Sequence, residues 1–405
     1  MDVLHERCAG LDISKKDAKV CVRTPSTKRR GSFTTETTMW GSTTNAVLEL
    51  RDHLLATRVT LVVIEATSLA EGLHVILVNA RQVKNLPGRK TDVSDAAWLA
   101  QLGAHGLVGP SFVPPEPVRE LRHLTRARTT ATRERSRVVQ RLEKLLEDTG
   151  IKLSAVASDI MGASCRAMLE GLICGEADPQ VLADLAKRSL RRKIPELTEA
   201  LTGRFREHPA FLDRLHLDHY DQLTTMIDRL TGRVEEAMAP FRGALDLLDT
   251  IPGINRATAE VIVAETGGDM TRFAMAKHLA SWAGVCPGHH ESAGRTKNTK
   301  VRPGNPYLKG ALGLAAFGAV RTKDTYLAAR YKRLTARRGP LRALVAVEHS
   351  IITAIWHMLT DTAAYQELGG TYFTQRAPER ATRRAITQLN QLGYTVTLNP
   401  RETTA

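Results

Sequence analysis

The segment from Val118 to Asp148 constrains the fold more than any other part of this 405-residue chain, because it contains neither glycine nor proline. Apolar residues such as Leu121 and Leu142 recur along it at helical spacing, and Gly150 is a natural stop. At about 1.5 Å per residue, such a helix is roughly 45 Å long. The segment therefore predicts an extended helical arm after the first hundred residues of the chain.

The same arm is strongly basic. Its candidates for contact with nucleic acid are Arg126, Arg133 and Arg137. Two interpretations fit these charges: a solvated face of a coiled-coil arm, or a surface that follows a nucleic-acid backbone by shape and charge. Because glutamates such as Glu134 alternate with the arginines, they favour a partner helix on one side. We therefore expect a dimerisation arm that also contacts nucleic acid.

The composition narrows the class of protein. A formal net charge of +14 favours a polyanionic partner, because each neutralised phosphate releases counterions. Aromatic residues make up only 5%, so recognition mainly by base stacking is not indicated. The chain has five cysteines, an odd number, and no Cys-x-x-Cys motif. This argues against a disulfide framework and favours a reducing compartment. With no secretory signal, and with charges interrupting the apolar stretch 341–359, we expect a cytoplasmic protein without membrane association.

The first hundred residues follow the pattern of an α/β domain. Three short strand candidates come first, at residues 7–13, 18–23 and 31–36. A helical pattern spans Thr43 to Ala56, and two nearly continuous apolar runs follow at 61–64 and 74–78. Runs without alternation are typical of strands covered on both faces, as in a parallel sheet. A second helical pattern begins at Thr91.

Four acidic residues lie at the ends of these elements. Asp12 ends the first strand, Glu65 follows the run at 61–64, and Asp92 and Asp95 share one face at a helix start. Gathered at one sheet edge, the four carboxylates would supply the oxygen ligands that Mg²⁺ prefers, and two such ions about 4 Å apart assist phosphodiester chemistry. The alternative is structural, because acids also stabilise helix N-termini and occupy turns and strand ends.

A family resemblance favours the metal site. Three stretches resemble the N-terminal RuvC-like domain of the DEDD insertion-sequence transposases of the IS110 family, whose members are guided by a bridge RNA; they read AGLDISK, VVIEAT and GRKTDVSDAAWLA. The resemblance implies an RNase H-like fold in which Asp12, Glu65, Asp92 and Asp95 bind Mg²⁺.

One departure from the family follows Glu65. Family members usually continue with Thr-Gly-x-Tyr and a full helix before the next strand, whereas only Ala66 to Leu73 are available here. A crossover between parallel strands normally takes a dozen or more residues. Either this helix is reduced to a single turn, or this copy carries an internal deletion.

The residues after the arm first indicate further helices, at residues 151–240, without a chemical motif. A break between two of them is expected at His208-Pro209. The segment from Leu247 to Asn255 then leads into a helical pattern and resembles a helix-hairpin-helix, whose turn presents backbone N–H groups to a phosphate. An ordinary pair of packed helices that binds nothing fits the same residues equally well.

A glycine-rich, basic loop follows from Val285 to Asn305. Its candidates for contact with nucleic acid are Arg295, Lys297, Lys300, Arg302 and Asn305. A serine in such a loop can attack phosphorus and hold a covalent link, but the residues alone do not favour Ser292 over other serines. The stretch LASWAGVCPGHHESAG, with the downstream RPGN and Leu308, resembles the C-terminal transposase domain of the same family. This resemblance implies that Ser292, in a Ser-x-Gly element, is the nucleophile.

These features together predict a DNA transposase and recombinase of the α/β plus all-α class. We expect four parts: an RNase H-like (RuvC-like) domain at 1–110, a helical coiled-coil arm at 111–240, a transposase domain with the helix-hairpin-helix-like element and the serine loop at 241–365, and a peripheral tail at 366–405. The resemblance implies that the chain uses Mg²⁺, acts on DNA with a guide RNA, and forms a homo-oligomer, a dimer or tetramer. Two alternatives are a RuvC-type metal-dependent nuclease without a covalent serine step and an inactive DNA-binding copy.

Overall fold

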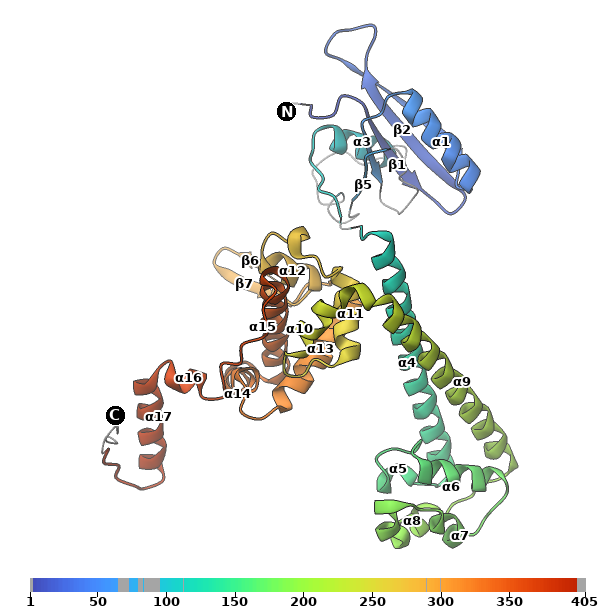
Figure 1. Cartoon of the computed structure of the whole chain (residues 1–405), viewed down its shortest axis with the longest axis vertical. Coiled ribbons are helices and arrows are strands. Elements are labelled where there is room, and N and C mark those ends of the chain that lie inside the picture. Colours follow the sequence, from blue (N-terminus) through green and yellow to red (C-terminus); the bar gives the residue numbers. More distant parts are fainter. Residues whose placement is uncertain are drawn as a thin grey trace. The chain divides into compact units, whose positions relative to one another are not determined.

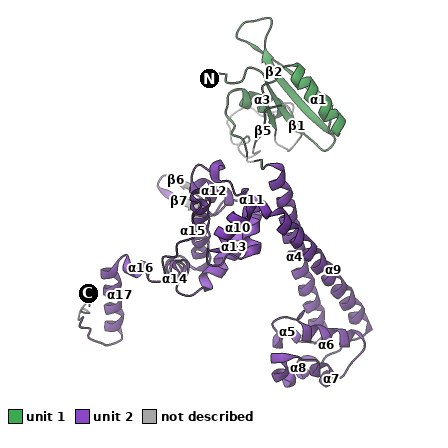
Figure 2. Cartoon of the chain, in the orientation of Figure 1, with its two compact units in different colours: residues 1–114 green, residues 115–405 purple. Residues whose placement is uncertain are grey.

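The computed structural model describes residues 3–64, 73–78, 83, 95–111, 113–288, 290–298 and 300–398, with only the backbone at 290–292 and 296–298 (Figure 1). The chain divides into two compact units, residues 1–114 and residues 115–405 (Figure 2). The first unit combines a sheet with helices, and the second consists mostly of helices. This confirms the predicted mixture of an α/β part and a helical part.

Unit 1 is built on a five-stranded sheet in the order β3-β2-β1-β4-β5. The strands are β1 (Cys8–Ile13), β2 (Asp17–Pro25), β3 (Phe33–Gly41), β4 (Leu61–Ile64) and β5 (Val75–Leu77). β1 pairs antiparallel with β2, and β2 antiparallel with β3, whereas β1, β4 and β5 run parallel. The segment 66–73, where the sequence predicts a shortened crossover, lies outside the described residues except for Leu73.

Helices cover both faces of this sheet. α1 (Thr44–Ala56) buries Leu50 and Leu54 against one face, together with residues such as Val62 of β4. α3 (Asp95–Ala104) buries Leu99 on the other face, together with Val63 of β4. Neighbouring residues of β4 thus point to opposite sides, as the pleat of a strand requires. Both sides of the strand are buried, which explains its continuous apolar run.

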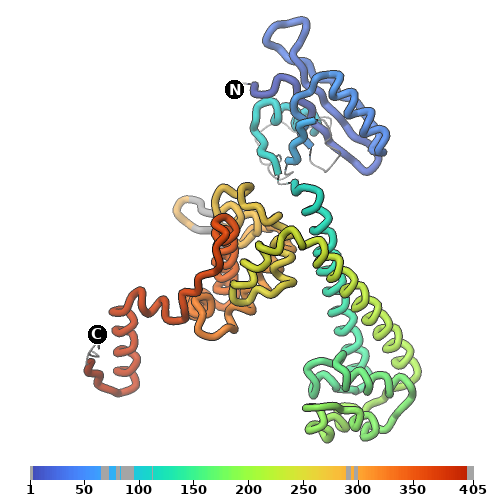
Figure 3. The backbone as a smooth tube through the Cα atoms, viewed as in Figure 1, coloured from blue at the N-terminus to red at the C-terminus, as the bar shows by residue number. Residues whose placement is uncertain are grey.

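Unit 2 begins with the predicted basic helix, α4 (Glu116–Thr149), which ends at Gly150 in the left-handed conformation with φ 87°. α9 (Glu207–Ala237) returns alongside it, as the path of the chain shows (Figure 3). The partner helix that the interleaved glutamates favour is therefore supplied by the same chain. Dimerisation of the arm stays a prediction.

A small group of helices packs on the end of this helix pair. It comprises α5 (Leu153–Val156), α6 (Ala163–Ile173), α7 (Pro179–Asp184), the 3₁₀ turn η1 (Arg188–Lys193) and α8 (Ile194–Ala200). Its core includes Met168 and Leu197 and continues to Leu217 of α9. The predicted helix break at His208-Pro209 is wrong, because α9 begins before it at Glu207. Proline is tolerated in the first turn, where its missing N–H has no helical acceptor.

The helices from α10 to α15 share one core. They are α10 (Arg242–Asp249), α11 (Arg256–Thr266), α12 (Ala276–Ala283), α13 (Pro306–Arg321), α14 (Tyr326–Arg338) and α15 (Pro340–Asp361). Among the described helices, α15 alone is long and apolar enough to cross a membrane, yet Val347, Ile351 and Ile355 are fully buried in this core. The chain continues into α16 (Tyr372–Gln375) and α17 (Pro378–Gln391), neither of which buries a residue.

Candidate functional site

Helix α3 crosses the sheet so closely that only glycine fits at the crossing. A Cβ on Gly10 of β1 would lie 2.1 Å from the carbonyl oxygen of Ala96, near the start of α3. A Cβ on Gly103, near the end of the same helix, would lie 2.9 Å from the Sγ of Cys8, the first residue of β1. The helix therefore runs opposite to β1, with its N-terminus at the end where β1 finishes.

This arrangement brings together two of the four predicted metal ligands. Asp12 lies two residues beyond Gly10, so it belongs to the side of β1 that faces α3. Asp95 is the first residue of α3 and precedes Ala96. Both aspartates are half-buried, and they lie at the same end and on the same face of the sheet.

The other two predicted ligands, Glu65 and Asp92, lie outside the described residues. β4 runs parallel to β1 with Ile64 paired to Leu11, and Glu65 is the next residue of the sequence. Within the described ranges, no three His, Cys, Asp or Glu side chains gather as a metal site. Since half of the quartet falls outside those ranges, the complete cluster stays a prediction.

The segment that contains Ser292 forms a β-hairpin where the sequence predicts an irregular loop. β6 (His290–Ser292) pairs antiparallel with β7 (Arg295–Asn298), and Ser292 pairs with Arg295. The turn residues Ala293 and Gly294 have φ values of 50° and 72°, as in the two-residue turns that match strand twist. Ser292 is thus the last strand residue before the tip. Strands of three and four mostly polar residues carry no apolar alternation, so the sequence pattern does not show them.

Two glycines close the base of this hairpin. Gly284 follows α12 with φ 75°, and a Cβ on Gly304 would lie 2.4 Å from its backbone nitrogen. The N–H of Gly288 donates to the carbonyl oxygen of Lys300 at 3.2 Å, and the N–H of Asn305 donates to that of Trp282 at 3.3 Å. The two ends of the hairpin segment are therefore held together at backbone distance.

Asn305 makes its side-chain contacts within the protein. Its Oδ1 accepts hydrogen bonds from the N–H groups of Tyr307 and Leu308 at 3.0 and 3.1 Å, which caps the N-terminus of α13. Its Nδ2 donates to Glu265 of α11 at 2.6 Å. Although the sequence predicts a contact with nucleic acid, these bonds give Asn305 a structural role beside the hairpin.

Glu265 also binds the helical arm. Its carboxylate is fully buried and accepts two hydrogen bonds from Arg126 of α4, at 2.7 and 2.8 Å. These bonds raise the pKa of Arg126 above its usual value, whereas burial lowers the pKa of the neighbouring Arg122. Glu265 therefore joins α4 to Asn305 at the base of the hairpin. Glu265 was not singled out from the sequence. The available signal was an acidic residue on the largely apolar helix α11, in a chain that also contains the arginine-rich helix α4.

The other predicted nucleic-acid contacts are mostly at the surface. Arg133 and Arg137 are exposed on α4, and Arg137 forms an exposed pair with Glu134 at 3.3 Å. Three more lie exposed along the hairpin segment, namely Arg295, Lys300 and Arg302. The side chain of Lys297, like that of Ser292, lies outside the described part of the chain.

Two models of known protein families match segments of this chain. The DEDD transposase model for IS110 elements matches residues 9–151, and the model described as "Transposase IS116/IS110/IS902 family" matches residues 245–332. Together they cover more than half of the chain. The chain belongs to the IS110 family of transposases. The two matched segments of the transposase contain Asp12 and Asp95 in the first and Ser292 in the second.

Several individual proteins are similar to the transposase. It is 27% identical over 326 residues to the IS900 uncharacterized 42 kDa protein of Mycobacterium paratuberculosis, which covers 74% of this chain and 80% of that protein. It is 26% identical over 331 residues to the IS116 uncharacterized 44.8 kDa protein of Streptomyces clavuligerus, covering 73% and 79%. A shorter match, 34% over 77 residues, is to the pilin gene-inverting protein of Moraxella bovis, covering 19% and 24%.

Proposed function

We propose that this transposase cuts and rejoins DNA with the acidic residues of unit 1 and with Ser292 of unit 2. The observation that carries the proposal is the position of Asp12 and Asp95 on one face at one end of the sheet. Ligands of a single cation must converge in this way. The strand order β3-β2-β1-β4-β5, with three antiparallel strands followed by two parallel ones, supports an RNase H-like fold for the unit.

The donor set fits a hard divalent cation. Asp12 and Asp95 offer carboxylate oxygens, and Glu65 and Asp92 would add two more of the same kind. Oxygen ligands are those that Mg²⁺ prefers, whereas thiolates and imidazoles favour softer metals. Mg²⁺ bound by these residues would stabilise the charge that develops on phosphodiester oxygens.

Ser292 supplies the nucleophile in this proposal. Its Oγ attacks the phosphorus and loses its proton, the bond from phosphorus to the 3′ oxygen breaks, and that oxygen leaves as a 3′ hydroxyl. A 3′ hydroxyl of another strand then attacks the phosphoserine and restores the serine. Each step exchanges one phosphoester for another, so no external energy is required. The hairpin supports this role, because it places Ser292 beside a turn and opposite the exposed Arg295.

Trapping the covalent link tests the serine step. A DNA substrate with a nick near the cleavage site releases the cut fragment, so that a phosphoserine adduct accumulates. We expect a denaturant-stable adduct with the unmutated protein and with Ser281→Ala, an exposed serine on α12, but none with Ser292→Ala. Cut DNA without an adduct would identify a metal-dependent nuclease. DNA binding without any cutting would identify an inactive copy.

We also propose that a guide RNA and further copies of this chain complete the active assembly. The net charge of +14 and the exposed arginines of α4 support a polyanionic partner. Sequencing of nucleic acid that copurifies with the protein tests the RNA. A discrete structured RNA encoded beside the gene is the expected result, and only heterogeneous fragments would contradict it. The molar mass in solution, measured by light scattering, tests the oligomer, and a monomer would overturn it.

A further inference from the structure

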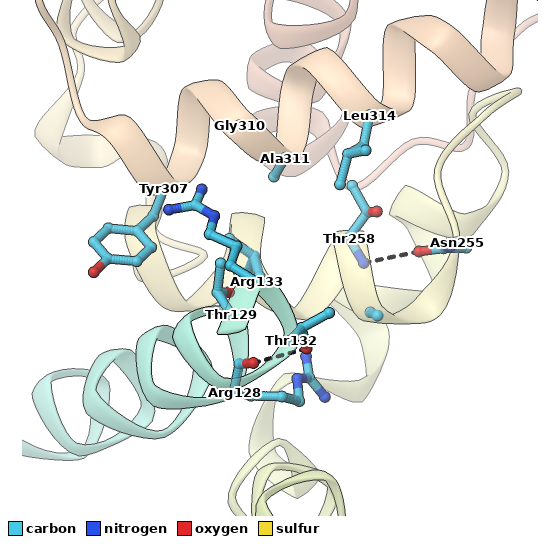
Figure 4. Close-up of a pocket in the computed structure, with 12 residues that line it drawn as sticks. Arg128, Thr129, Thr132, Arg133, Asn255, Thr258, Tyr307, Gly310, Ala311 and Leu314 are labelled. Carbon is cyan, nitrogen blue, oxygen red and sulfur yellow. Dashed lines mark hydrogen bonds between the residues drawn. The ribbon is translucent and has the colours of Figure 1, made fainter. Parts of the chain in front are cut away.

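A cavity of about 480 Å³ lies in unit 2 where α4, α11 and α13 meet (Figure 4). We call it the α4–α11–α13 groove. α4 contributes Arg128 and Arg133, α11 contributes Val261, and α13 contributes Tyr307, Gly310 and Leu314. None of these residues belongs to the acidic group of unit 1 or to the serine hairpin. The volume falls in the range of about 300–1,000 Å³ that small-molecule sites occupy.

Arg133 makes the groove attractive to an anion. Its guanidinium points from α4 toward α13 near Gly310 (Figure 4). The other arginine of the groove, Arg128, is nearly buried and already paired with Glu260 at 2.7 Å. Arg133 is exposed, and among the described residues it forms no ion pair; its guanidinium lies near the ring of Tyr307. The groove thus holds one cation whose charge is available to a single phosphate.

Tyr307 and Leu314 provide the apolar side of the groove. The half-buried ring of Tyr307 lies 4.8 Å from the guanidinium of Arg126 and 5.9 Å from that of Arg133. Since Arg126 is held by the buried Glu265, the ring is supported by a fixed neighbour. Leu314 is 69% exposed and points across the groove toward Thr258 (Figure 4). An exposed leucine and an aromatic ring beside an unpaired arginine suit a flat, partly apolar ligand with an anionic group.

We propose that the α4–α11–α13 groove binds one unpaired nucleotide, with its base against Leu314 and its phosphate on Arg133, beside the ring of Tyr307. The proposal rests on the proposed function, since it concerns the nucleic acid on which the transposase acts. Unstacked bases are taken up on aromatic rings and guanidinium groups, whereas the bases of a duplex are covered by their neighbours. The groove therefore distinguishes an unpaired segment from a paired one.

Filling the groove tests this without removing a charge. A Cβ on Gly310 would meet only the Nη2 of Arg133, at 3.5 Å, so α13 accepts a side chain there. Gly310→Phe projects a ring into the groove, and Gly310→Ala is its matched control for the effect on the helix. Arg133→Ala removes the cation, with Arg233→Ala, an exposed arginine of α9 paired with Glu236, as its control. Fluorescence anisotropy with the full chain then compares short single strands of DNA and of RNA with a DNA duplex of the same sequence.

We expect Gly310→Phe and Arg133→Ala to bind single strands at least tenfold more weakly, about 1.4 kcal/mol, and the duplex within twofold of the unmutated protein. Arg133→Ala should also lower the slope of log affinity against log salt by about 0.7, the value of one phosphate contact in a single strand. Both control variants should bind within twofold. The single strand that loses affinity, DNA or RNA, identifies the source of the nucleotide.

Two results would overturn the proposal. The first is that Gly310→Phe, shown by circular dichroism to be folded, binds single strands as tightly as the unmutated protein does. The other is an equal loss for single strands and duplex. If Gly310→Phe does not fold, the affinity and salt slope of Arg133→Ala decide by the same criteria. The covalent adduct at Ser292 is measured separately, so failure of the groove leaves the proposed function standing. An unmutated protein that binds no nucleic acid would overturn both.

Discussion

Replacing Glu265 with alanine should lower the stability of unit 2 more than replacing an exposed charged residue does. The fully buried carboxylate accepts hydrogen bonds from Arg126 at 2.7 and 2.8 Å and from Asn305 at 2.6 Å. Its removal leaves these donors without this acceptor and removes the carboxylate that pairs with Arg126. Breaking a buried ion pair costs about 3–5 kcal/mol. Because Arg126 keeps 36% of its side chain exposed, we expect the lower end, about 3 kcal/mol.

The expected loss corresponds to a fall in Tm of about 6–12 °C, at about 2–4 °C per kcal/mol for a unit of this size. Differential scanning calorimetry measures it. Glu236→Ala is the matched control, since Glu236 and Arg233 form a surface pair with side chains 69% and 66% exposed, and it should change stability by less than about 0.5 kcal/mol. Glu265→Gln keeps one acceptor oxygen and should fall between the two. Equal melting of Glu265→Ala and Glu236→Ala would refute the reasoning.

Three further predictions concern single residues. Gly10→Ala places a Cβ 2.1 Å from the carbonyl oxygen of Ala96, so unit 1 should lose at least about 3 kcal/mol in calorimetry, and an unchanged transition would contradict the close crossing of α3. Burial raises the pKa of Asp213 to about 7, and neither of its oxygens has a partner among the described residues. Between about pH 4 and pH 7 the folded state therefore holds a proton that the unfolded state has released, so stability falls as the pH rises. Between about pH 5 and pH 8 the free energy of unfolding, measured in urea, should fall by about 3 kcal/mol less in Asp213→Asn than in the unmutated protein. An unaltered pH dependence would count against a buried, protonated Asp213. Ala293→Gly relieves a left-handed φ of 50° and should slow hydrogen exchange in the serine hairpin about two- to fivefold, a gain of about 0.5–1 kcal/mol; faster exchange would contradict it.

The elements with strong periodicity could be predicted from the sequence. The arm expected at 118–148 is α4, Glu116–Thr149, because a long stretch without glycine or proline leaves few alternatives to a helix. The apolar run at 61–64 is β4, buried on both faces. The serine hairpin could not be predicted in this way, because its short polar strands are fixed by a turn and by contacts at the base rather than by an apolar face.

The sequence was less informative about which elements pack against one another. The glutamates of α4 indicate a partner helix, but the pattern of one helix does not say whether that partner comes from the same chain. The structure supplies α9. The positions of Asp12 and Asp95 follow from the rule that functional groups gather at strand ends, yet the direction of α3 depends on close approaches at Gly10 and Gly103. Tertiary contacts of this kind leave no periodic signal.

Backbone cleavage by bound iron measures most directly which segments surround the cation of unit 1. Fe²⁺ replaces Mg²⁺ at oxygen ligands, and with ascorbate and peroxide it releases hydroxyl radicals that cut the nearby chain, so mass spectrometry locates the site. We predict cuts at the end of β1 and at the start of α3, together with cuts next to Glu65 and Asp92. Excess Mg²⁺ and the double change Asp12→Asn with Asp95→Asn should abolish them, while Asp52→Asn, at an exposed residue of α1, should not. Cuts that avoid β1 and α3, or that persist in the double variant, would contradict a shared metal site.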